Sequence, residues 1–292
     1  MKPPVFAYVR PGTLDAAIAA LACYGEEAKI LAGGQSLVPL LNFRMLRPAA
    51  LIDINRIPGL DYVVESEDGS LQVGALTRHR TLETSPVVKD RFPILNAALA
   101  HVAHLAIRNR GTIGGSLSHA DPAAELPMMA LLLDAEIAIA GPNGTRVLAA
   151  RDFLVGTLAT ALTEDEIVTQ VAFPPLPAAA GWGFEEFAQR SGDFALAGVG
   201  AVLGVRDGRC VEARIALMGV DETAIRATQA ERLLVGERYD PDLVRAAATN
   251  ARAAINPNSD LRASAEYRRH LVAALAERVL VAAWRRAEGR LA

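Results

Sequence analysis

Residues 31–44 read LAGGQSLVPLLNFR, and residues 110–127 read RGTIGGSLSHADPAAELP. Each stretch contains a glycine pair that a serine follows within two positions, with neither Lys nor Arg at its centre. A glycine pair lets the backbone take positive φ and lets a ligand approach the main chain without meeting a Cβ. Successive N–H groups of such a loop converge on an anion, and a serine hydroxyl adds another donor. The two stretches therefore predict two anion-binding loops.

The surroundings of the first loop are typical of an α/β unit. AKIL (28–31) predicts a short buried strand, 36–46 predicts a helix, and LIDIN (51–55) predicts a second strand. A backbone loop between strand and helix is well placed to meet a phosphate. Two such loops from separate subdomains would hold a diphosphate from both sides. The lack of a P-loop lysine favours a permanently bound dinucleotide over exchanging ATP. Each loop taken singly is also typical of an ordinary turn, so the prediction depends on the pair.

The composition excludes several other classes of protein. A chain of 292 residues predicts two or three domains, and its net charge of -3 does not favour binding to nucleic acid or anionic lipid. Its two cysteines, Cys23 and Cys210, are too few for an iron–sulfur cluster or a structural zinc site. The N-terminus lacks the apolar region of a signal peptide, and no run approaches 18 apolar residues. We therefore expect a cytoplasmic protein.

The rest of the chain predicts an α+β protein. Two hairpins turn at Asp68-Gly69 and Asn143-Gly144, and the segment 173–183 (FPPLPAAAGWG) is the best domain boundary. Beyond it, 194–220 predicts a long hairpin. Three helices follow, over 222–234, after Asp240 and after Ser264.

Three further patterns resemble functional sites. Gly198, Gly200 and Gly204 resemble a Rossmann fingerprint, but a strand-like sequence flanks them, so a glycine-bearing strand is favoured. The group Ser116, Ser118, His119 and Asp121 suggests a hydrolase, yet triads assemble in space and the chain has no GxSxG motif. His101 and His104 lie three apart on a predicted helix without a neighbouring Cys or carboxylate. We predict no metal site and no catalytic side chain.

The two loop motifs, AGGQSLVPLLNFRM and IRNRGTIGGSLSHADPAAELP, closely resemble the FAD-binding medium subunits of the molybdenum hydroxylases. That family includes carbon monoxide dehydrogenase, nicotine dehydrogenase and xanthine dehydrogenase. The likeness also covers LIDINRIPGL, VGALTRH, SGDFALAGVGA and NPNSDLRASAEYRRHL, and thus nearly the whole chain. It implies a FAD-binding domain of the vanillyl-alcohol-oxidase-like (PCMH) type over 1–176, with subdomains of about 1–57 and 58–176. A C-terminal domain of the carbon monoxide dehydrogenase flavoprotein type, a small antiparallel sheet with helices, would occupy 182–292.

The resemblance also implies which residues bind FAD. The first loop would wrap the diphosphate and ribityl chain, and the second would close on it from the other subdomain. Asp121 and Glu125 would lie near sugar or ribityl hydroxyls, and Ile167 near the adenine or flavin. Phe194 stands where carbon monoxide dehydrogenase has a tyrosine over the flavin, so it keeps the ring face without the hydroxyl. The complete implied set is Leu31, Ala32, Gly33, Gly34, Gln35, Ser36, Leu37, Val38, Thr112, Ile113, Gly114, Gly115, Ser116, Asp121, Glu125, Ile167 and Phe194.

The implied function is electron transfer within an oxidoreductase complex. A large partner subunit would hold the molybdenum cofactor, and a small one two [2Fe–2S] clusters, in a dimer of heterotrimers. This chain would take electrons from those clusters onto FAD and pass them to an external acceptor. The substrate stays open among an N-heterocycle, carbon monoxide and an aldehyde, with the heterocycle favoured, and the terminal acceptor is open too. Two other functions are weighed: a stand-alone flavin oxidoreductase and a FAD-free assembly protein.

Overall fold

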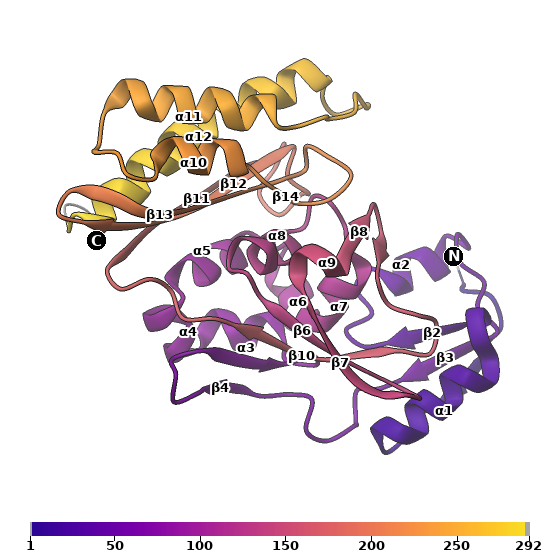
Figure 1. Cartoon of the computed structure of the whole chain (residues 1–292). Coiled ribbons are helices and arrows are strands. Elements are labelled where there is room, and N and C mark those ends of the chain that lie inside the picture. Colours follow the sequence, from indigo (N-terminus) through magenta and orange to yellow (C-terminus); the bar gives the residue numbers. More distant parts are fainter. Residues whose placement is uncertain (1, 290–292) are drawn as a thin grey trace.

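The computed structural model describes residues 2–289 and confirms the α+β class. Its described part contains sheets of three, five, four and two strands. The three largest sheets follow one another along the chain (Figure 1). Each contributes to a buried apolar cluster. No helix within residues 2–289 is long and apolar enough to cross a membrane.

The first sheet is parallel, in the order β1-β3-β2. Thr13 caps the N-terminus of helix α1, where its hydroxyl oxygen accepts the N–H of Ala16, and Gly25, with φ 54°, caps the C-terminus. Helix α2 is shorter than predicted and stops at Asn42, because the chain turns at Arg44 with φ 58°. The elements are β1 (Ala7–Val9), α1 (Leu14–Tyr24), η1 (Gly25–Glu27), β2 (Ala28–Leu31), α2 (Leu37–Asn42) and β3 (Ala50–Asp53).

The second sheet is antiparallel, in the order β4-β5-β10-β6-β7, and its two hairpins turn at the predicted Gly69 and Gly144. Helices pack on one face around a large apolar core. The strands are β4 (Val63–Glu65), β5 (Leu71–Gly74), β6 (Glu136–Gly141), β7 (Gly144–Ala149) and β10 (Ile167–Phe173), with the small pair β8 (Leu154–Gly156) and β9 (Ala159–Thr160). The helices are α3 (His79–Thr84), α4 (Pro86–Arg91), α5 (Pro93–His101), α6 (Leu105–Arg108), α7 (Ile113–His119), α8 (Glu125–Leu132) and α9 (Ala150–Phe153).

The helical pattern of 85–103 contains two helices rather than one. Helix α4 ends at Arg91 and α5 begins at Pro93, because a proline is compatible with the first turn of a helix and not with its interior. Helix α5 in turn ends at His101, and His104 lies beyond it as the residue before α6. The prediction that His101 and His104 share a helix was therefore wrong.

The C-terminal sheet lies between two layers of helices (Figure 1). Helices α10–α12 cover one face, and α5 and α8 pack against the other. The glycines that resembled a Rossmann fingerprint lie inside strand β12. A Cβ at Gly200 would stand 2.8 Å from Leu132 of α8, so close packing explains that glycine. The elements are β11 (Ala180–Phe187), β12 (Ala197–Arg206), β13 (Arg209–Met218), β14 (Ile225–Arg226), α10 (Thr228–Leu234), α11 (Pro241–Ala253) and α12 (Ala265–Ala287).

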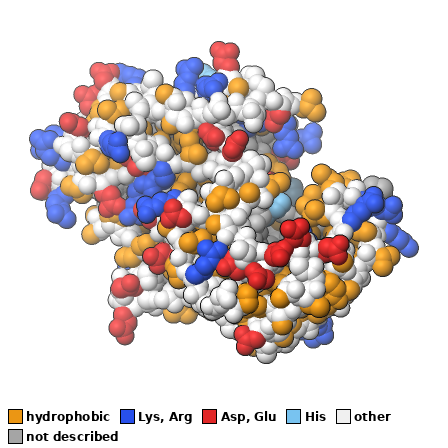
Figure 2. Space-filling model, turned by 45° about the vertical axis from the view of Figure 1, so that its right-hand side comes forward, with side chains coloured by type: hydrophobic (Ala, Val, Ile, Leu, Met, Phe, Trp, Pro, Cys, Tyr) orange, Lys and Arg blue, Asp and Glu red, His pale blue; other side chains and the backbone are white. Residues whose placement is uncertain are grey.

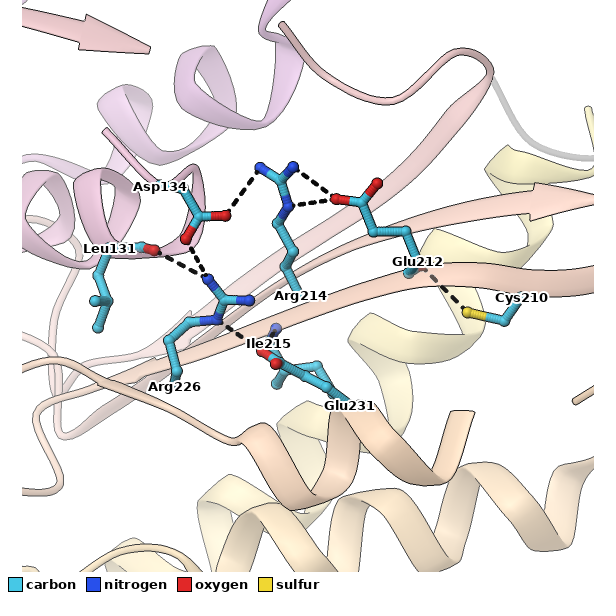
Figure 3. Close-up of polar contacts among 8 residues, drawn as sticks. All are labelled: Leu131, Asp134, Cys210, Glu212, Arg214, Ile215, Arg226 and Glu231. Carbon is cyan, nitrogen blue, oxygen red and sulfur yellow. Dashed lines mark hydrogen bonds and ion pairs between the residues drawn. The ribbon is translucent and has the colours of Figure 1, made fainter. Parts of the chain in front are cut away.

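Ion pairs fasten the end of α8 to this sheet (Figure 3). Arg226 donates from Nε to Glu231 at 2.7 Å and from Nη1 to Asp134 at 2.8 Å. Arg214 of the adjacent strand β13 pairs with the other carboxylate oxygen of Asp134 at 3.4 Å. The side chains of Arg214 and Arg226 are only 14% and 19% exposed, so screening by solvent is incomplete and the pairs contribute to docking of the two parts.

Candidate functional site

The two glycine loops lie against each other although some 80 residues of sequence, from Gly33 to Arg110, separate them. A Cβ at Gly33 would stand 2.5 Å from the carbonyl oxygen of Arg110 and 2.8 Å from the Cα of Gly111. A Cβ at Gly115 would be 4.0 Å from the Cβ of Ala32. The first loop extends from β2 of the parallel sheet. The second glycine pair, predicted as a loop, instead lies in the first turn of α7 in the middle part. The structure thus brings the two predicted loops together where two subdomains meet.

The first loop offers a set of free backbone donors. Gly34 has φ 73°, and within residues 2–289 the N–H groups of residues 33–36 donate to no protein acceptor. The Gln35 side chain donates to the carbonyl of Gly33 at 2.8 Å, and the N–H of Val38 donates to the carbonyl of Gly34 at 3.0 Å. Consecutive free amides in a glycine turn form a concave anion site. The arrangement therefore fits a phosphate group.

The second loop differs from the prediction, because its amides are already bonded within the protein. Ile113 and Gly114 donate to the carbonyls of Thr77 and Ala75, at 3.1 and 2.9 Å. Gly115 donates to the side-chain oxygen of Thr112 at 3.2 Å, and Ser116 to its carbonyl at 3.0 Å. These bonds form the N-terminal cap of α7 and fix it to the end of β5. The expectation of a second amide nest was therefore wrong. The loop presents a close glycine surface and the Ser116 hydroxyl instead.

A polar bridge that the sequence analysis did not identify connects the two loops. Asn55 donates from Nδ2 to the carbonyls of Leu31 and Ala32, at 3.2 and 2.8 Å. Arg78 donates from Nη2 to Asn55 Oδ1 at 2.7 Å and from Nη1 to the carbonyl of Arg110. The signal was visible in part, since Asn55 is the last residue of LIDIN and Arg78 lies in VGALTRH. Their contact is long-range, and no local pattern encodes it.

Asp53 holds the Asn55 side chain of this bridge in place by hydrogen bonds. It accepts from the Asn55 backbone N–H at 3.0 Å and from Asn55 Nδ2 at 2.7 Å, and it also accepts from the hydroxyl of Tyr8. Burial acts to raise the pKa of Asp53, but the hydrogen bonds from Tyr8 and Asn55 outweigh it and hold the pKa below its usual range. The carboxylate therefore stays charged and orients the Asn55 amide toward the first loop.

His79 lies buried beneath the second loop. A Cβ at Gly111 would meet its ring at 2.8 Å. A weak contact of the ring with the Thr112 backbone acts to raise the pKa of His79, but burial outweighs it. Burial lowers the pKa of His79 to about 4, assisted by the positive charges of Arg108 and Arg78. The ring is therefore neutral at neutral pH, and Gly111 is required above it.

The remaining predicted residues lie in two different environments. Phe194, in the loop before β12, is 51% exposed and shares with Asp121 the wall of an open cavity of about 270 Å³. Ile167, by contrast, is 1% exposed and packs in the N-terminal apolar cluster with Leu76 and Ala140. Phe194 presents a free ring face, whereas a ligand contact by the Ile167 side chain stays a prediction.

Glu125, the first residue of α8, belongs to a buried polar cluster. It is 8% exposed, and burial, together with the negative charge of Glu186, raises its pKa to about 8. His101 approaches Glu186 with 3.3 Å between Nδ1 and Oε1. A hydrogen bond to Glu186 raises the pKa of His101. At neutral pH the cluster thus holds an uncharged Glu125 near the contact between His101 and Glu186.

Figure 2 shows a hollow between the lobe at the right, which holds the N-terminal sheet, and the rest of the molecule. The free amides around Gly34 suit a diphosphate. The absence of a Cβ at Gly33 lets a ligand approach the main chain closely. The exposed ring of Phe194 suits contact with a flat ring. Within residues 2–289, no group of three or more His, Cys, Asp and Glu could hold a metal ion. The fold and these loops define a protein that binds a dinucleotide between two lobes.

Comparison with known proteins identifies the class. The family described as "FAD binding domain in molybdopterin dehydrogenase" matches residues 4–176, and "CO dehydrogenase flavoprotein C-terminal domain" matches residues 182–283. The chain therefore belongs to the FAD-binding medium subunits of the molybdenum hydroxylases, a family of oxidoreductases. The predicted FAD-binding fold with its C-terminal sheet domain, and FAD as the cofactor, are confirmed.

Individual relatives are similar along their whole length. The 6-hydroxypseudooxynicotine dehydrogenase complex subunit alpha of Paenarthrobacter nicotinovorans is 43% identical over 98% of this chain and 97% of its own. A chain of quinoline 2-oxidoreductase from Pseudomonas putida 86 superposes with a TM-score of 0.93 at 42% identity, covering 100% of both chains. A chain of carbon monoxide dehydrogenase from Hydrogenophaga pseudoflava gives a TM-score of 0.96 at 39% identity over 98% and 99% of the two chains.

Proposed function

We propose that this chain binds FAD and uses it to pass electrons from a partner subunit to an external acceptor. In this proposal a small subunit with [2Fe–2S] clusters supplies the electrons, and a large subunit with the molybdenum cofactor oxidises the substrate. FAD supplies the step between single-electron and two-electron chemistry when bound. We also propose the domain limits predicted from the sequence: subdomains of about 1–57 and 58–176 for FAD, and 182–292 for the C-terminal domain.

The contact between Gly33 and Arg110 carries the proposal. It places the free amides of residues 33–36 at the junction of two subdomains, where a long dinucleotide can lie with its diphosphate on one lobe and its rings along the other. The hydrogen bonds from Asn55 to Ala32 and from Arg78 to Asn55 fix the two segments relative to each other in the absence of a ligand. Preorganised donors of this kind lower the cost of ordering a ligand. The chain's own residues therefore bind and orient, and leave the redox chemistry to the cofactor.

The relatives support the partner subunits. One is named as a subunit of a dehydrogenase complex and another as the medium chain of carbon monoxide dehydrogenase. The two cysteines of this chain lie apart, Cys23 exposed and Cys210 buried, so neither can join a cluster within this chain. Among substrates, an N-heterocycle is favoured, because one relative is named nicotine 6-hydroxylase and another quinoline 2-oxidoreductase.

A direct test uses this chain together with its candidate partners. The chain should purify with a flavin absorbance band. When mixed with a reduced [2Fe–2S] subunit of a relative, its flavin should bleach at a rate set by the protein concentration. A colourless chain that takes up no FAD would favour the assembly-protein alternative. Turnover of a small organic substrate by the chain alone would favour the stand-alone oxidoreductase.

A further inference from the structure

Arg268 of helix α12 is a buried arginine whose side-chain hydrogen bonds leave its own helix. The residue is 7% exposed. It donates from Nη1 to the carbonyl of Leu196 at 2.6 Å and to that of Gly219 at 2.8 Å, and from Nη2 to Asp260 Oδ2 at 2.8 Å. These acceptors lie in three segments, before β12, after β13 and before α12. A buried charge is costly unless such bonds compensate it, so one guanidinium fastens three segments together.

The bond to Leu196 anchors the loop that carries Phe194. Residues 188–196 connect β11 to β12, and Leu196 uses both of its backbone groups. Its N–H donates to the carbonyl of Phe187 at 2.7 Å, and its carbonyl accepts from Arg268 at 2.6 Å. Phe194 precedes this anchor by two residues and is 51% exposed. Its position therefore depends on the anchored backbone rather than on burial of its own ring.

The bond to Gly219 reaches a second segment of the same cavity. Gly219 has φ 73°, and its N–H donates at 2.8 Å to the carbonyl of Pro122, the residue after Asp121. Arg268, Phe194 and Asp121 all line the open cavity of about 270 Å³. One guanidinium is therefore connected to both segments, to that of Phe194 through Leu196 and to that of Asp121 through Gly219.

The cavity lies at the other end of α7 from the free amides of the first loop. Gly115 is in the first turn of α7, and a Cβ there would be 4.0 Å from the Cβ of Ala32. Asp121 lies two residues beyond the last residue of the same helix. A helix of seven residues is about 10 Å long. A dinucleotide with its diphosphate on the amides of residues 33–36 can extend over this distance to the Phe194 ring.

We propose that Arg268 is a positioning residue for this end of the site. Its guanidinium holds the Phe194 loop at a fixed separation from the Asp121 segment, and thereby places the Phe194 ring for contact with the flat part of FAD. The planar guanidinium fork serves two carbonyls and a carboxylate at once, whereas a lysine ammonium is a single point charge. The inference rests on the proposed function for the presence of FAD. Loss of the guanidinium should loosen the loop and weaken FAD binding through Phe194 alone.

Hydrogen exchange of the full chain, followed by mass spectrometry of its peptides, tests the anchor without any FAD. In Arg268→Gln the amides of residues 188–197 should exchange at least about tenfold faster than in the wild type, because local opening of the loop becomes easier. Arg268→Lys keeps the charge, provides a milder variant should Arg268→Gln not fold, and should accelerate the same amides at least about threefold. Wild-type exchange in Arg268→Lys overturns the inference.

Arg226→Gln is the matched control for the exchange experiment. Arg226 is another largely buried arginine of the C-terminal sheet, with a side chain 19% exposed, but its bonds go to Glu231, Asp134 and the carbonyl of Leu131. This variant should lose stability and leave the exchange of residues 188–197 unchanged. Equal acceleration in Arg226→Gln and Arg268→Lys would show a general loosening of the domain and would contradict a specific anchor.

Titration of the apoprotein with FAD tests whether Arg268 acts through Phe194. Phe194→Ala and Arg268→Lys should each weaken FAD binding at least about fivefold, whereas the double variant should bind at most about twofold more weakly than Phe194→Ala. The reason is that no ring is left for the guanidinium to place. A merely structural role predicts that the two effects multiply, to about 25-fold. Multiplying effects would therefore overturn the positioning role.

The outcomes separate this inference from the proposed function. A wild-type chain that takes up no FAD removes the proposed function, while hydrogen exchange still decides whether Arg268 anchors the loop. Multiplying effects, or wild-type FAD affinity in Phe194→Ala, remove the positioning role and leave FAD binding and electron transfer in place.

Discussion

Gly33 in the first loop packs directly on the main-chain carbonyl of Arg110 in the second, with no room for a side chain between them. The two lobes therefore meet at this contact, where we propose that they share one ligand surface. Backbone donors come from one lobe, while the other contributes a close glycine surface whose own amides are bonded internally. Substitutions in the two glycine pairs should therefore have different effects, because only the first pair lies among free backbone donors.

Replacing Gly33 by alanine should separate the loops. The new Cβ would lie 2.5 Å from a backbone oxygen that cannot rotate away, so one loop must move. We expect FAD affinity to fall at least tenfold, which is about 1.4 kcal/mol. Titration of apoprotein with FAD, followed by flavin fluorescence, measures this. Gly12→Ala is the control, since a Cβ there meets nothing within 4 Å. Equal affinities for the two variants would contradict the shared surface.

The bridge between the lobes should show energetic coupling. Asn55→Ala and Arg78→Ala each remove one partner of the 2.7 Å hydrogen bond between Nη2 and Oδ1. Urea unfolding of both single variants and of the double variant gives the coupling energy. We expect about 1–3 kcal/mol, as for hydrogen bonds to a charged group. Arg80→Ala, which removes a surface pair with Glu83, should cost little. Additive effects of Asn55→Ala and Arg78→Ala would mean that the two lobes are held by other contacts.

His79 should make the protein sensitive to acid. Its folded-state pKa, about 4, lies below its ordinary value of 6.5, so the unfolded chain binds a proton that the folded chain rejects. Stability is therefore complete above pH 6.5 and is lost as the pH falls toward 4, by up to roughly 3 kcal/mol. In His79→Leu this part of the loss should vanish, so that the free energy of unfolding falls less steeply between these pH values. An exposed control, His270→Leu, should keep the wild-type slope. The same slope in His79→Leu would disprove the assignment.

The ion pairs of Arg226 should fasten the C-terminal sheet to α8. Arg226→Ala leaves Glu231 and Asp134 without their shared cation, and Glu231 is only 12% exposed. We expect the free energy of unfolding to fall by about 2–3 kcal/mol, close to the values for partly buried pairs that lose one member. Arg245→Ala removes a pair whose side chains are 56% and 83% exposed and should change it by less than about 0.5 kcal/mol. Differential scanning calorimetry distinguishes the two, and similar losses would argue against the docking role.

Much of the fold could be predicted because its signals are local. The caps at Asp240 and Ser264 and the hairpin turns at Gly69 and Gly144 lie where the sequence predicts them. Helix α2 and the pair α4–α5 were predicted too long. A pattern of apolar residues shows where a helix can run, whereas a residue such as Arg44 at positive φ, or the break before Pro93, decides where it ends.

The site could be predicted only in part. The first glycine pair was recognisable as a loop, whereas the second lies in the first turn of α7. The sequence could not show that the Gly114 and Gly115 amides are already used by Ala75 and Thr112. The link from Asn55 to Arg78 and the pair of His101 with Glu186 join residues that are 23 and 85 positions apart, respectively. Hydrogen bonds over such separations depend on the packing of several elements at once.

The sequence alone determined most strands and turns, the first glycine loop and the family to which the chain belongs, because each of these depends on residues that are neighbours in the chain. Only the tertiary structure decided which backbone amides stay free for a ligand and which acidic side chains are buried. Both depend on what water can reach. Burial raises the pKa of Glu125 and lowers that of His79, and burial is a property of the folded whole.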